Sequence, residues 1–378
     1  MPCSRLRCTA RRRSPPPPKP SSTWPPSPYI LPTPTPYPNW SVTTTKPLPY
    51  RPFRHGPKYH VTMGLRTIPS FSWIELDSDY PRYHATKAAR LASSRGPHCV
   101  RTAPEALPAA EELLSDLASY LPARYPSLFR RTKTGGIENL WSGESFPTTR
   151  KTAKGGETWD PMAICARLVQ DDLALMLPPT DGSGEYRLLS GAILLPGFWR
   201  LQDKFGMSLS TIHTSGAVPQ FESRLQRGML NLFRRLKPEE LVARSNYFMQ
   251  VDDDLAWSWS IGDEETGEAG WDTAAKDRAI EHHMFRSERQ TLRRLPRTGA
   301  VVFTIRTYFM PVTEIVKEPY VPARLASAVR SWGDDVAKYK GKQRYGKVLL
   351  EYLDKKHAEQ VANGLDLDKE DEMRSYPF

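Results

Sequence analysis

Apolar and polar residues alternate most regularly over residues 300–308, a segment rich in Val, Phe, Ile, Thr and Tyr. This composition, with a period of two, is typical of a β-strand. Alternation separates the side chains into two faces, Val301, Phe303, Ile305 and Thr307 against Val302, Thr304, Arg306 and Tyr308. Arg306 and Tyr308 therefore lie side by side. Such a face either covers a polar cavity or contacts solvent, and the pattern alone leaves both readings open.

The segment before this strand, residues 277–295, is basic, and its spacing predicts a helix. Pro296 must end that helix, because proline has no N–H to donate. Arg297, Thr298 and Gly299 then predict a tight turn that leads into the strand.

The predicted basic helix has a face that suits an anion. His282, Arg286 and Arg289 would share this face, and a carboxylate or a propionate is the anion that they would bind. The alternative is an exposed helix whose cations pair with Glu281 and Glu288.

The remaining pattern predicts both helices and strands. Helices are predicted at residues 77–92, 103–119, 162–171, 219–236, 323–338 and 347–363. Strands are predicted within residues 59–65, 186–196 and 241–260, and a hairpin within residues 125–159. The elements do not alternate in βαβ order, so we expect an α+β fold with an antiparallel sheet and flanking helices. We expect three regions, a Pro-rich arm (1–58), a folded domain (59–330) and a C-terminal helical extension (331–378).

Residues 1–58 hold 17 of the 36 prolines and no acidic residue. SPPPPKP and LPTPTPYP favour extended polyproline II, so we expect a disordered basic arm. The Arg-rich start is similar to a transit peptide, but Pro15 interrupts it before an amphipathic helix of sufficient length. We expect a cytoplasmic protein. Organelle targeting by the arm, or binding of the arm to a partner's aromatic groove, are the alternatives.

The positive charge of the chain is concentrated in this arm. Of the 53 Lys and Arg residues, 11 precede the first acidic residue, Glu75, so the remaining 42 equal the 42 Asp and Glu residues. The folded part is therefore near neutral although the sequence pI is about 9.4. It lacks the excess of basic residues that nucleic-acid binding requires, and we expect no nucleic-acid partner. No apolar run reaches the roughly 18 residues of a membrane span, so none is expected.

Common catalytic and metal signatures are missing from the sequence, including the Walker loop, G-x-G-x-x-G, H-E-x-x-H and G-x-S-x-G. The four cysteines, Cys3, Cys8, Cys99 and Cys165, show no C-x-x-C spacing, which leaves no zinc, iron–sulfur or disulfide pattern. This use of cysteine fits a reducing compartment.

His213 is the strongest single candidate for chemistry. It follows an apolar segment at the mouth of a predicted turn, where a histidine can serve as a metal or haem ligand or as an acid/base group. The alternative is a loop histidine that bonds to the backbone. The run Asp252 to Asp254 lacks calcium-loop spacing and predicts a turn with solvated charges.

Three ordered segments carry a family resemblance. They are LSGAILLPGFWRLQDKFGMSLSTIHTSGAVPQF (residues 189–221), NYFMQVDDDLAWS (residues 246–258) and FRSERQTLRRLPRTGAVVFTIRTYFMPV (residues 285–312). Together they resemble the haem-dependent oxidative N-demethylase family, its catalytic alpha subunit and fungal relatives, over about residues 59–330.

The resemblance implies a haem b in a PAS-like α+β fold, with oxygen activated at the iron. In the founding bacterial enzymes of the family, dimethylamine is oxidised to a primary amine and formaldehyde, with NADPH electrons that separate subunits supply. For this chain the resemblance implies a small amine substrate, O₂ and a separate electron-donor protein. No flavin or iron–sulfur module is visible in the sequence.

The resemblance also implies roles for particular residues. His213 would be the iron ligand. Three basic residues, Arg289, Arg293 and Arg294, would hold the haem propionates. Arg306, Tyr308 and Glu314 would line the distal or substrate side, where a carboxylate pairs with a protonated amine. We therefore expect residues 286–314 to face His213.

Two rival functions follow from the same sequence. A non-catalytic haem-binding PAS-like sensor or carrier predicts haem uptake without turnover. A non-haem scaffold recruited through the Pro-rich arm predicts partner binding that is lost on deletion of residues 1–58.

Overall fold

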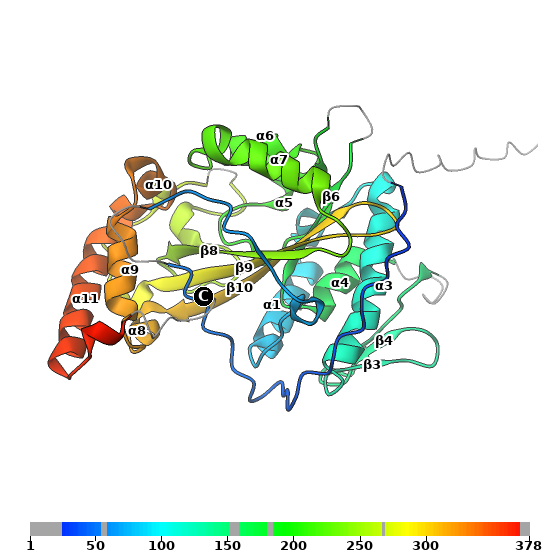
Figure 1. The fold of residues 1–378 in the computed structure, drawn as a ribbon, viewed down its shortest axis with the longest axis horizontal. Helices are drawn as coiled ribbons and strands as arrows, with labels where there is room; N and C mark the ends of the chain where they lie inside the picture. The colour runs from blue at the N-terminus through cyan, green and yellow to red at the C-terminus, as the bar shows by residue number, and fades with distance from the viewer. Residues whose placement is uncertain (1–24, 54–58, 151–158, 180–183, 267–268, 371–378) are drawn as a thin grey trace, which may run out of the picture.

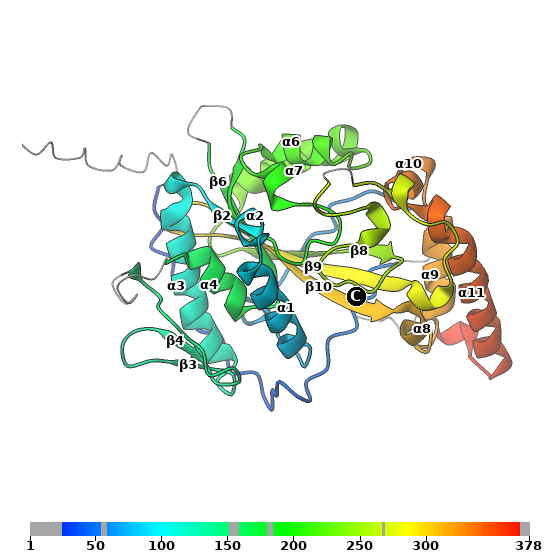
Figure 2. The same ribbon diagram turned by 180° about the vertical axis from the view of Figure 1, so that it is seen from behind.

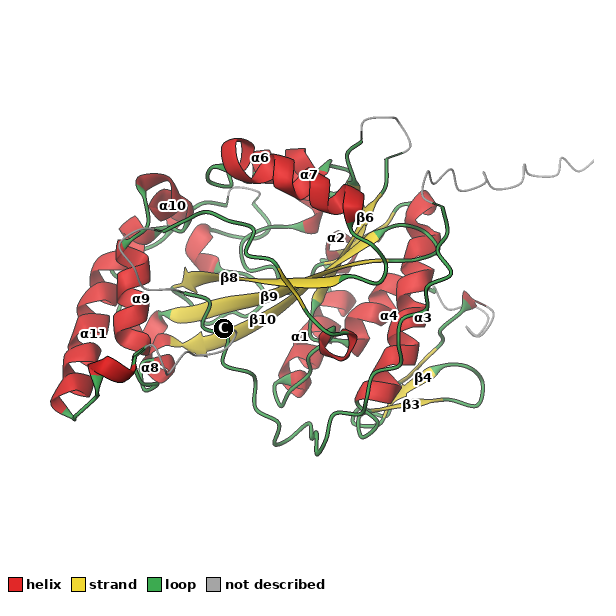
Figure 3. Ribbon diagram, in the orientation of Figure 1, coloured by secondary structure: helices red, strands yellow, loops and turns green. Residues whose placement is uncertain are grey.

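The computed structural model describes residues 25–53, 59–150, 159–179, 184–266 and 269–370 (Figure 1). Its centre is a seven-stranded antiparallel sheet with strand order β1-β8-β9-β10-β6-β7-β2. Helices flank the sheet on both faces and at one end (Figure 3). The predicted α+β class, an antiparallel sheet with flanking helices, is confirmed.

The two longest strands, β9 (Met284–Arg294) and β10 (Val301–Pro311), lie in the middle of this sheet. Strand β10 confirms the predicted strand. Strand β9 pairs along its whole length with β10 on one side and with β8 (Leu241–Gln250) on the other. The prediction of a basic helix over residues 277–295 is therefore wrong.

The error at β9 has a physical reason. Every residue of β9 is buried, because helices cover both faces of the sheet. Polar residues then occur on both faces, and the period of two that marks a half-exposed strand is lost. Arg286 and Arg289, which a helix would place on one face, point to opposite faces of the strand. The predicted turn is confirmed, since Leu295 N donates to Ala300 O (2.8 Å) and Gly299 adopts a φ of 72°.

The remaining strands are shorter. They are β1 (Arg66–Thr67), β2 (Val100–Thr102), β6 (Asp172–Leu177) and β7 (Arg187–Ala192). No strand forms within residues 59–65, and the strand pair predicted within residues 186–196 is the single strand β7.

One face of the sheet is covered by α1 (Tyr80–Ala92), α3 (Leu107–Arg124) and α4 (Pro161–Leu168), which lie below the sheet in Figure 1 and in front of it in Figure 2. Apolar residues of α3 and α4 pack with Leu173, Leu175 and Val302 of the sheet. The helices predicted at residues 77–92, 103–119 and 162–171 are confirmed. Beside α3 lies the hairpin region predicted within residues 125–159, formed by β3 (Phe129–Arg131), β4 (Ile137–Asn139) and β5 (Ser145–Phe146).

The opposite face is covered by helices between β7 and β8. They are α5 (Leu201–Lys204), α6 (Leu209–Ser215), the π-helix η4 (Phe221–Leu225) and α7 (Gln226–Arg235). Leu209 and Phe233 of this layer pack with Leu292 and Val301 of the sheet. The helix predicted at residues 219–236 is confirmed, as η4 followed by α7.

The C-terminal helices pack against one end of the sheet (Figure 1). They are α8 (Val312–Ile315), α9 (Val321–Arg330), α10 (Asp334–Tyr339) and α11 (Lys342–Ala362). Shorter helices are α2 (Gly96–Cys99), η1 (Ser70–Ser72), η2 (Pro104–Ala106), η5 (Trp259–Ile261), η6 (Trp271–Thr273), η7 (Ile280–His282) and η8 (Leu367–Lys369). Across the part of the chain that the structure describes, no helix is both long and apolar enough to cross a membrane.

Residues 25–53 run as an extended segment along the folded domain (Figure 1). Trp40, Tyr50 and Phe53 are buried, and Trp40 Nε1 donates to Leu76 O (2.7 Å). The expectation of a disordered arm is therefore wrong for these residues. Prolines hold the segment extended, while its aromatic side chains provide the burial that fixes it to the domain. Residues 1–24 and 54–58 of the predicted arm lie outside the described residues.

We expect Trp40→Ala to lower the free energy of unfolding by about 3–5 kcal/mol, because it opens a cavity against Tyr125 and leaves Leu76 O without its donor. The side chain of Trp141 is 43% exposed, so Trp141→Ala should change the free energy of unfolding by less than about 1 kcal/mol. Urea unfolding followed by circular dichroism measures both. Equal effects of the two substitutions would show that the extended segment is not part of the core.

Candidate functional site

His213 lies in α6, on the side of the sheet that α5 to α7 cover. Its Nδ1 lies 2.8 Å from Leu209 O, and since a carbonyl only accepts, Nδ1 carries the proton. The imidazole stacks on the Phe221 ring at 4.9 Å between centroids. Nε2 forms no hydrogen bond with any described residue. Burial lowers the pKa of His213, which keeps the ring neutral and leaves the Nε2 lone pair available to a metal.

Arg244 on β8 is the second notable group on this side of the sheet. Its positive charge contributes to lowering the pKa of His213, so the two groups are near neighbours. Its guanidinium forms no hydrogen bond or ion pair within the described residues, and Nε is fully covered. Burial lowers the pKa of Arg244, with Glu288, Tyr59 and Tyr339 around it. Arg244 is only partly buried, and the charge of Glu288 acts on it without forming an ion pair. Its unused N–H donors therefore suit a ligand that brings a negative charge.

Helical segments lie next to β8 and β9. Gln220, just before η4, donates from Nε2 to Asp335 of α10 (2.9 Å), which joins the α6–α7 segment to the C-terminal helices. The Phe248 ring of β8 contacts the rings of Phe198 (5.2 Å) and Tyr339 (6.0 Å). This face of the sheet therefore offers an imidazole, a guanidinium and an aromatic wall.

Arg306 and Tyr308 point to the opposite face, towards α1. Arg306 pairs with Asp77 (2.6 Å), and its guanidinium lies 4.5 Å from the centroids of both the Tyr83 and Tyr308 rings. Tyr308 Oη donates to Glu75 (2.8 Å). The expectation that these two residues face His213 is wrong, because the even positions of β10 share a face with Leu175 and Val302 and not with α6.

Arg289 belongs to the same network. It donates to the carbonyl oxygens of Trp73 (3.0 Å) and Ser72, and its Nε lies 3.2 Å from Glu75. Tyr50 of the extended N-terminal segment also donates to Glu75 (2.9 Å). The predicted Arg/Tyr face is thus neither solvated nor an open cavity, since protein groups satisfy its charges.

The other predicted residues are dispersed. Arg293 pairs with Asp116 of α3 (2.7 Å). Arg294, on the α7 side, donates to Leu236 O and Gly299 O (2.6 Å each) and to other protein oxygens. Glu314 is 51% exposed and pairs with Lys317 (2.7 Å). The propionate role of Arg289, Arg293 and Arg294 remains a prediction, and it would require each of them to exchange partners.

Sequence reasoning missed Arg244. The signal was present, because Arg244 is the one charged residue in LVARSNYFMQ, a segment predicted to contain a strand. A lone arginine within an otherwise uncharged strand must either reach solvent or find an anion.

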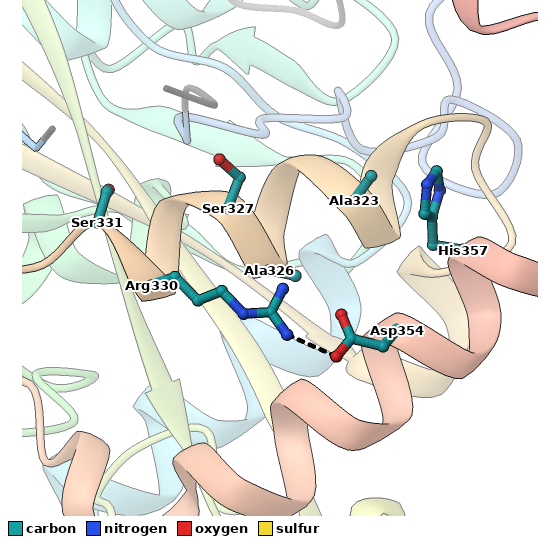
Figure 4. A pocket seen from close by; sticks show the side chains of 7 residues that line it. All are labelled: Ala323, Ala326, Ser327, Arg330, Ser331, Asp354 and His357. Carbon is teal, nitrogen blue, oxygen red and sulfur yellow. Dashed lines mark hydrogen bonds and ion pairs between the residues drawn. The ribbon is translucent and has the colours of Figure 1, made fainter. Parts of the chain in front are cut away.

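Two further observations bear on where a ligand binds. Within the described residues, no group of three or more His, Cys, Asp or Glu is placed to hold a metal ion. A groove of about 470 Å³ lies between α9 and α11, where Arg330 pairs with Asp354 (Figure 4). Its lining residues are Ala323, Ala326, Ser327, Arg330, Ser331, Asp354 and His357. It belongs to the C-terminal helices, and neither His213 nor Arg244 contributes to it.

Fold and site define a class, an α+β protein with a central antiparallel sheet. One face of this sheet carries a neutral histidine and a partly buried arginine that no described residue pairs with. Residues 64–350 match the family described as haem-dependent oxidative N-demethylase, alpha subunit-like. The match covers more than half of the chain, and the chain belongs to this family. The resemblance drawn from the sequence is thereby confirmed. The matched region extends past residue 330 and includes α9, α10 and the first part of α11.

Asp171 is a buried carboxylate without a hydrogen-bond partner in the network around Arg306. It is fully buried, and neither oxygen accepts a well-formed hydrogen bond from the described residues. Burial raises the pKa of Asp171 to about 6, although the charges of Arg306, Arg289 and Lys87 oppose the shift. The protonated form is therefore favoured below about pH 6.

We expect Asp171→Asn to stabilise the protein increasingly as the pH rises. The folded state binds the proton more tightly than the unfolded state, so this carboxyl contributes least stability once it ionises. The free energy of unfolding of the wild type should fall by about 2 kcal/mol relative to the variant between about pH 4 and pH 7. Urea unfolding at both pH values measures the difference.

Asp272→Asn is the matched control, because the Asp272 side chain is 97% exposed and its removal should give no such trend. A variant that is less stable than the wild type at neutral pH would contradict the assignment, because it would mean that Asp171 is ionised and held by Arg306.

Proposed function

We propose that this protein is a haem b-dependent monooxygenase that oxidatively demethylates a small secondary amine such as dimethylamine. The proposal rests on family membership together with one structural observation, the neutral His213 with a free Nε2 beside the unpaired Arg244. A porphyrin supplies four ligands to iron, so a single protein histidine completes the site. The layer of α5 to α7 over the sheet would be the haem-binding part of a PAS-like arrangement.

His213 would hold the iron through Nε2. The Nδ1–H bond to Leu209 O fixes the tautomer and the ring orientation, and Phe221 restrains the ring from one side. Because burial lowers the pKa of His213, protons compete weakly with the metal near neutral pH.

Arg244 would pair with a haem propionate. Its guanidinium has the charge and the hydrogen-bond donors that a carboxylate requires, and no described residue uses them. This assignment places the propionate contact on β8, whereas the sequence pointed to Arg289, Arg293 and Arg294.

The reaction balances only with electrons from outside the chain. Bound haem would supply the oxygen-activating chemistry. Demethylation of R–NH–CH₃ consumes O₂, two electrons and two protons, and gives R–NH₂, formaldehyde and water. The cysteine spacings offer no iron–sulfur site in this chain, so a separate donor protein, with NADPH as the source of electrons, completes the proposal.

The donor would dock on α7. Arg224, Arg227, Arg234, Arg235 and Lys237 are all exposed, and none forms an ion pair with a described residue. The four arginines lie within about 100° around the helix axis, so they form one basic surface. Phe221, which opens this segment, stacks on His213, so the surface lies near the proposed iron ligand. A donor with an acidic surface fits it.

We expect His213→Ala to abolish formaldehyde release from dimethylamine and to shift or remove the Soret band of haem-loaded protein, because the iron loses its protein ligand. Absorption spectra and a formaldehyde assay with NADPH and a surrogate reductase measure both. Methylamine and formaldehyde should appear in equal amounts with the wild type.

His282→Ala is the control, since this exposed histidine lies in η7, away from α6. Arg244→Gln should keep the Soret position but weaken haem affinity about tenfold through the lost charge pair. A wild-type Soret band that His213→Ala leaves unchanged would refute the ligand assignment. Haem uptake without formaldehyde release with any secondary amine would favour the sensor or carrier function.

We expect Arg227→Glu/Arg234→Glu to slow haem reduction by an acidic [2Fe–2S] ferredoxin about 10- to 100-fold at low ionic strength, with the loss shrinking as salt is added. Stopped-flow spectroscopy of the Soret band measures the rate. Lys347→Glu on the exposed side of α11 should leave it unchanged. The rate of haem reduction by dithionite should be the same in the wild type, the double variant and Lys347→Glu. Equal rates of reduction by ferredoxin in these three proteins would exclude α7 as the docking surface.

A further inference from the structure

The extended N-terminal segment contains an alternating proline run at residues 31–36. Pro32, Pro34 and Pro36 each follow a residue of another type. A proline fixes its own φ at about −65° and confines the preceding residue to extended backbone, so every residue of this run is restricted. None of these residues belongs to a helix or a strand. An extended chain without strand partners is the backbone of a polyproline II helix.

Burial along this run repeats every three residues. Leu31 and Tyr37 are half-buried and Pro34 is buried, whereas the residues between them are exposed. A polyproline II helix has three residues per turn, so these three side chains lie on one edge of the helix. A β-strand would bury every second residue instead. The segment is therefore a polyproline II helix that rests on the folded domain by one of its three edges.

The folded domain holds this inner edge beside α3, where Figure 1 shows the segment in dark blue. Leu31 and Tyr37 pack against the apolar core that includes α3. Tyr37 N donates to Arg124 O (2.8 Å), and Arg124 Nη1 donates to Thr35 O (2.9 Å). The Arg124 guanidinium also lies 4.7 Å from the centroid of the Tyr37 ring. These contacts order the segment before any partner binds.

The two outer edges of the helix present prolines and an apolar side chain to solvent. Pro32 and Thr33 form one exposed pair, and Thr35 and Pro36 form a second pair one turn later. One turn of polyproline II advances the chain by about 9 Å, which sets the spacing of the two pairs. Ile30 lies one turn before Thr33, and its side chain is 84% exposed, more than any other large apolar side chain of the described residues. Together these five residues form an outer ridge.

A groove lined by aromatic side chains is the surface that fits this ridge. Its rings form shallow pockets, and each pocket takes a pair of residues from two edges of a polyproline II helix. The third edge of the helix then points away from the groove, and in this protein the third edge is the one that contacts α3. Prolines have no N–H to desolvate, and an ordered helix loses little backbone freedom on binding. The partner and α3 therefore use different side chains of the same helix.

We propose that the outer ridge binds the aromatic groove of a polyproline-recognising protein domain, and that the fold presents the ridge in its bound conformation. The ridge precedes residues 64–350, which match the family, so this inference does not rest on the proposed function. The segment lies beside α3, on the face of the sheet opposite to α6 and α7. A partner on the ridge therefore leaves His213 and the basic surface of α7 uncovered.

The test titrates the full-length protein with isolated SH3, WW and EVH1 domains and measures affinity by calorimetry. The four consecutive prolines of SPPPPKP are replaced by alanine in every protein, so that only the ridge is tested. At least one domain should bind, and Pro32→Ala/Pro36→Ala should weaken its binding about 10- to 100-fold, because each exposed pair loses its proline. Pro49→Ala, at an exposed proline outside the ridge, should leave the affinity unchanged. Urea midpoints should agree among these proteins, since all three prolines are exposed.

Two further measurements separate the ridge from its alternatives. A peptide of residues 28–39 should bind the same domain about tenfold more weakly than the full-length protein, because the free peptide must still be ordered. Thr35→Glu, which keeps every proline of the ridge, should weaken binding by placing a charge in an apolar pocket.

Four outcomes would overturn the proposal. They are the absence of binding by every domain, an unchanged affinity of Pro32→Ala/Pro36→Ala, binding by the peptide but not by the folded protein, and an outer ridge that a second copy of the chain covers. Light scattering detects the last of these, as a dimer that the double variant converts into a monomer. None of these outcomes bears on haem binding or demethylation, which are measured separately.

Discussion

The fold depends on the burial of arginines in the middle of its sheet. Arg286, Arg289, Arg293, Arg294 and Arg306 are all buried on β9 and β10, where a charge without partners would be costly. Their partners come from distant segments, including Ser72 and Trp73, Asp77, Asp116, Leu195 and Leu236. Most of these partners are backbone carbonyl oxygens. The hydrogen bonds that solvate the buried arginines therefore also hold the loops in place. The extended N-terminal segment takes part as well, because Tyr50 shares Glu75 with Arg289 and Tyr308.

Against this background Arg244 is the informative exception. It is only partly buried, unlike the arginines of β9, and no described residue forms a hydrogen bond or an ion pair with its guanidinium. The sheet thus separates two kinds of chemistry. The α1 side neutralises its charges internally, and the α6 side presents a neutral imidazole and an arginine that no described residue pairs with.

Parts of this site could be predicted from the sequence. His213 was identified because it stands in an ordered set of segments that the family shares, and the geometry of α6 gives it the tautomer a metal ligand needs. The arginines of residues 286–314 were recognised as important, but their roles could not be assigned. A strand that is buried on both faces shows no alternation of apolar and polar residues. The spacing of Arg286 and Arg289 was therefore interpreted as one helical face, although the two side chains lie on opposite sides of the sheet. Glu288 was first considered only as a surface ion-pair partner for the same reason.

The sequence by itself determined the α+β class, most of the helices, the β10 strand, the turn at Gly299 and the family. Each of these depends on local composition or on the order of segments along one chain. The tertiary structure decided which charges meet. Pairing of Arg306 with Asp77 spans 229 residues, and that of Arg289 with Glu75 spans a similar distance. Such contacts leave no local periodicity. Only packing of the layers shows that Arg244, unlike its neighbours, has no hydrogen-bond or ion-pair partner among the described residues.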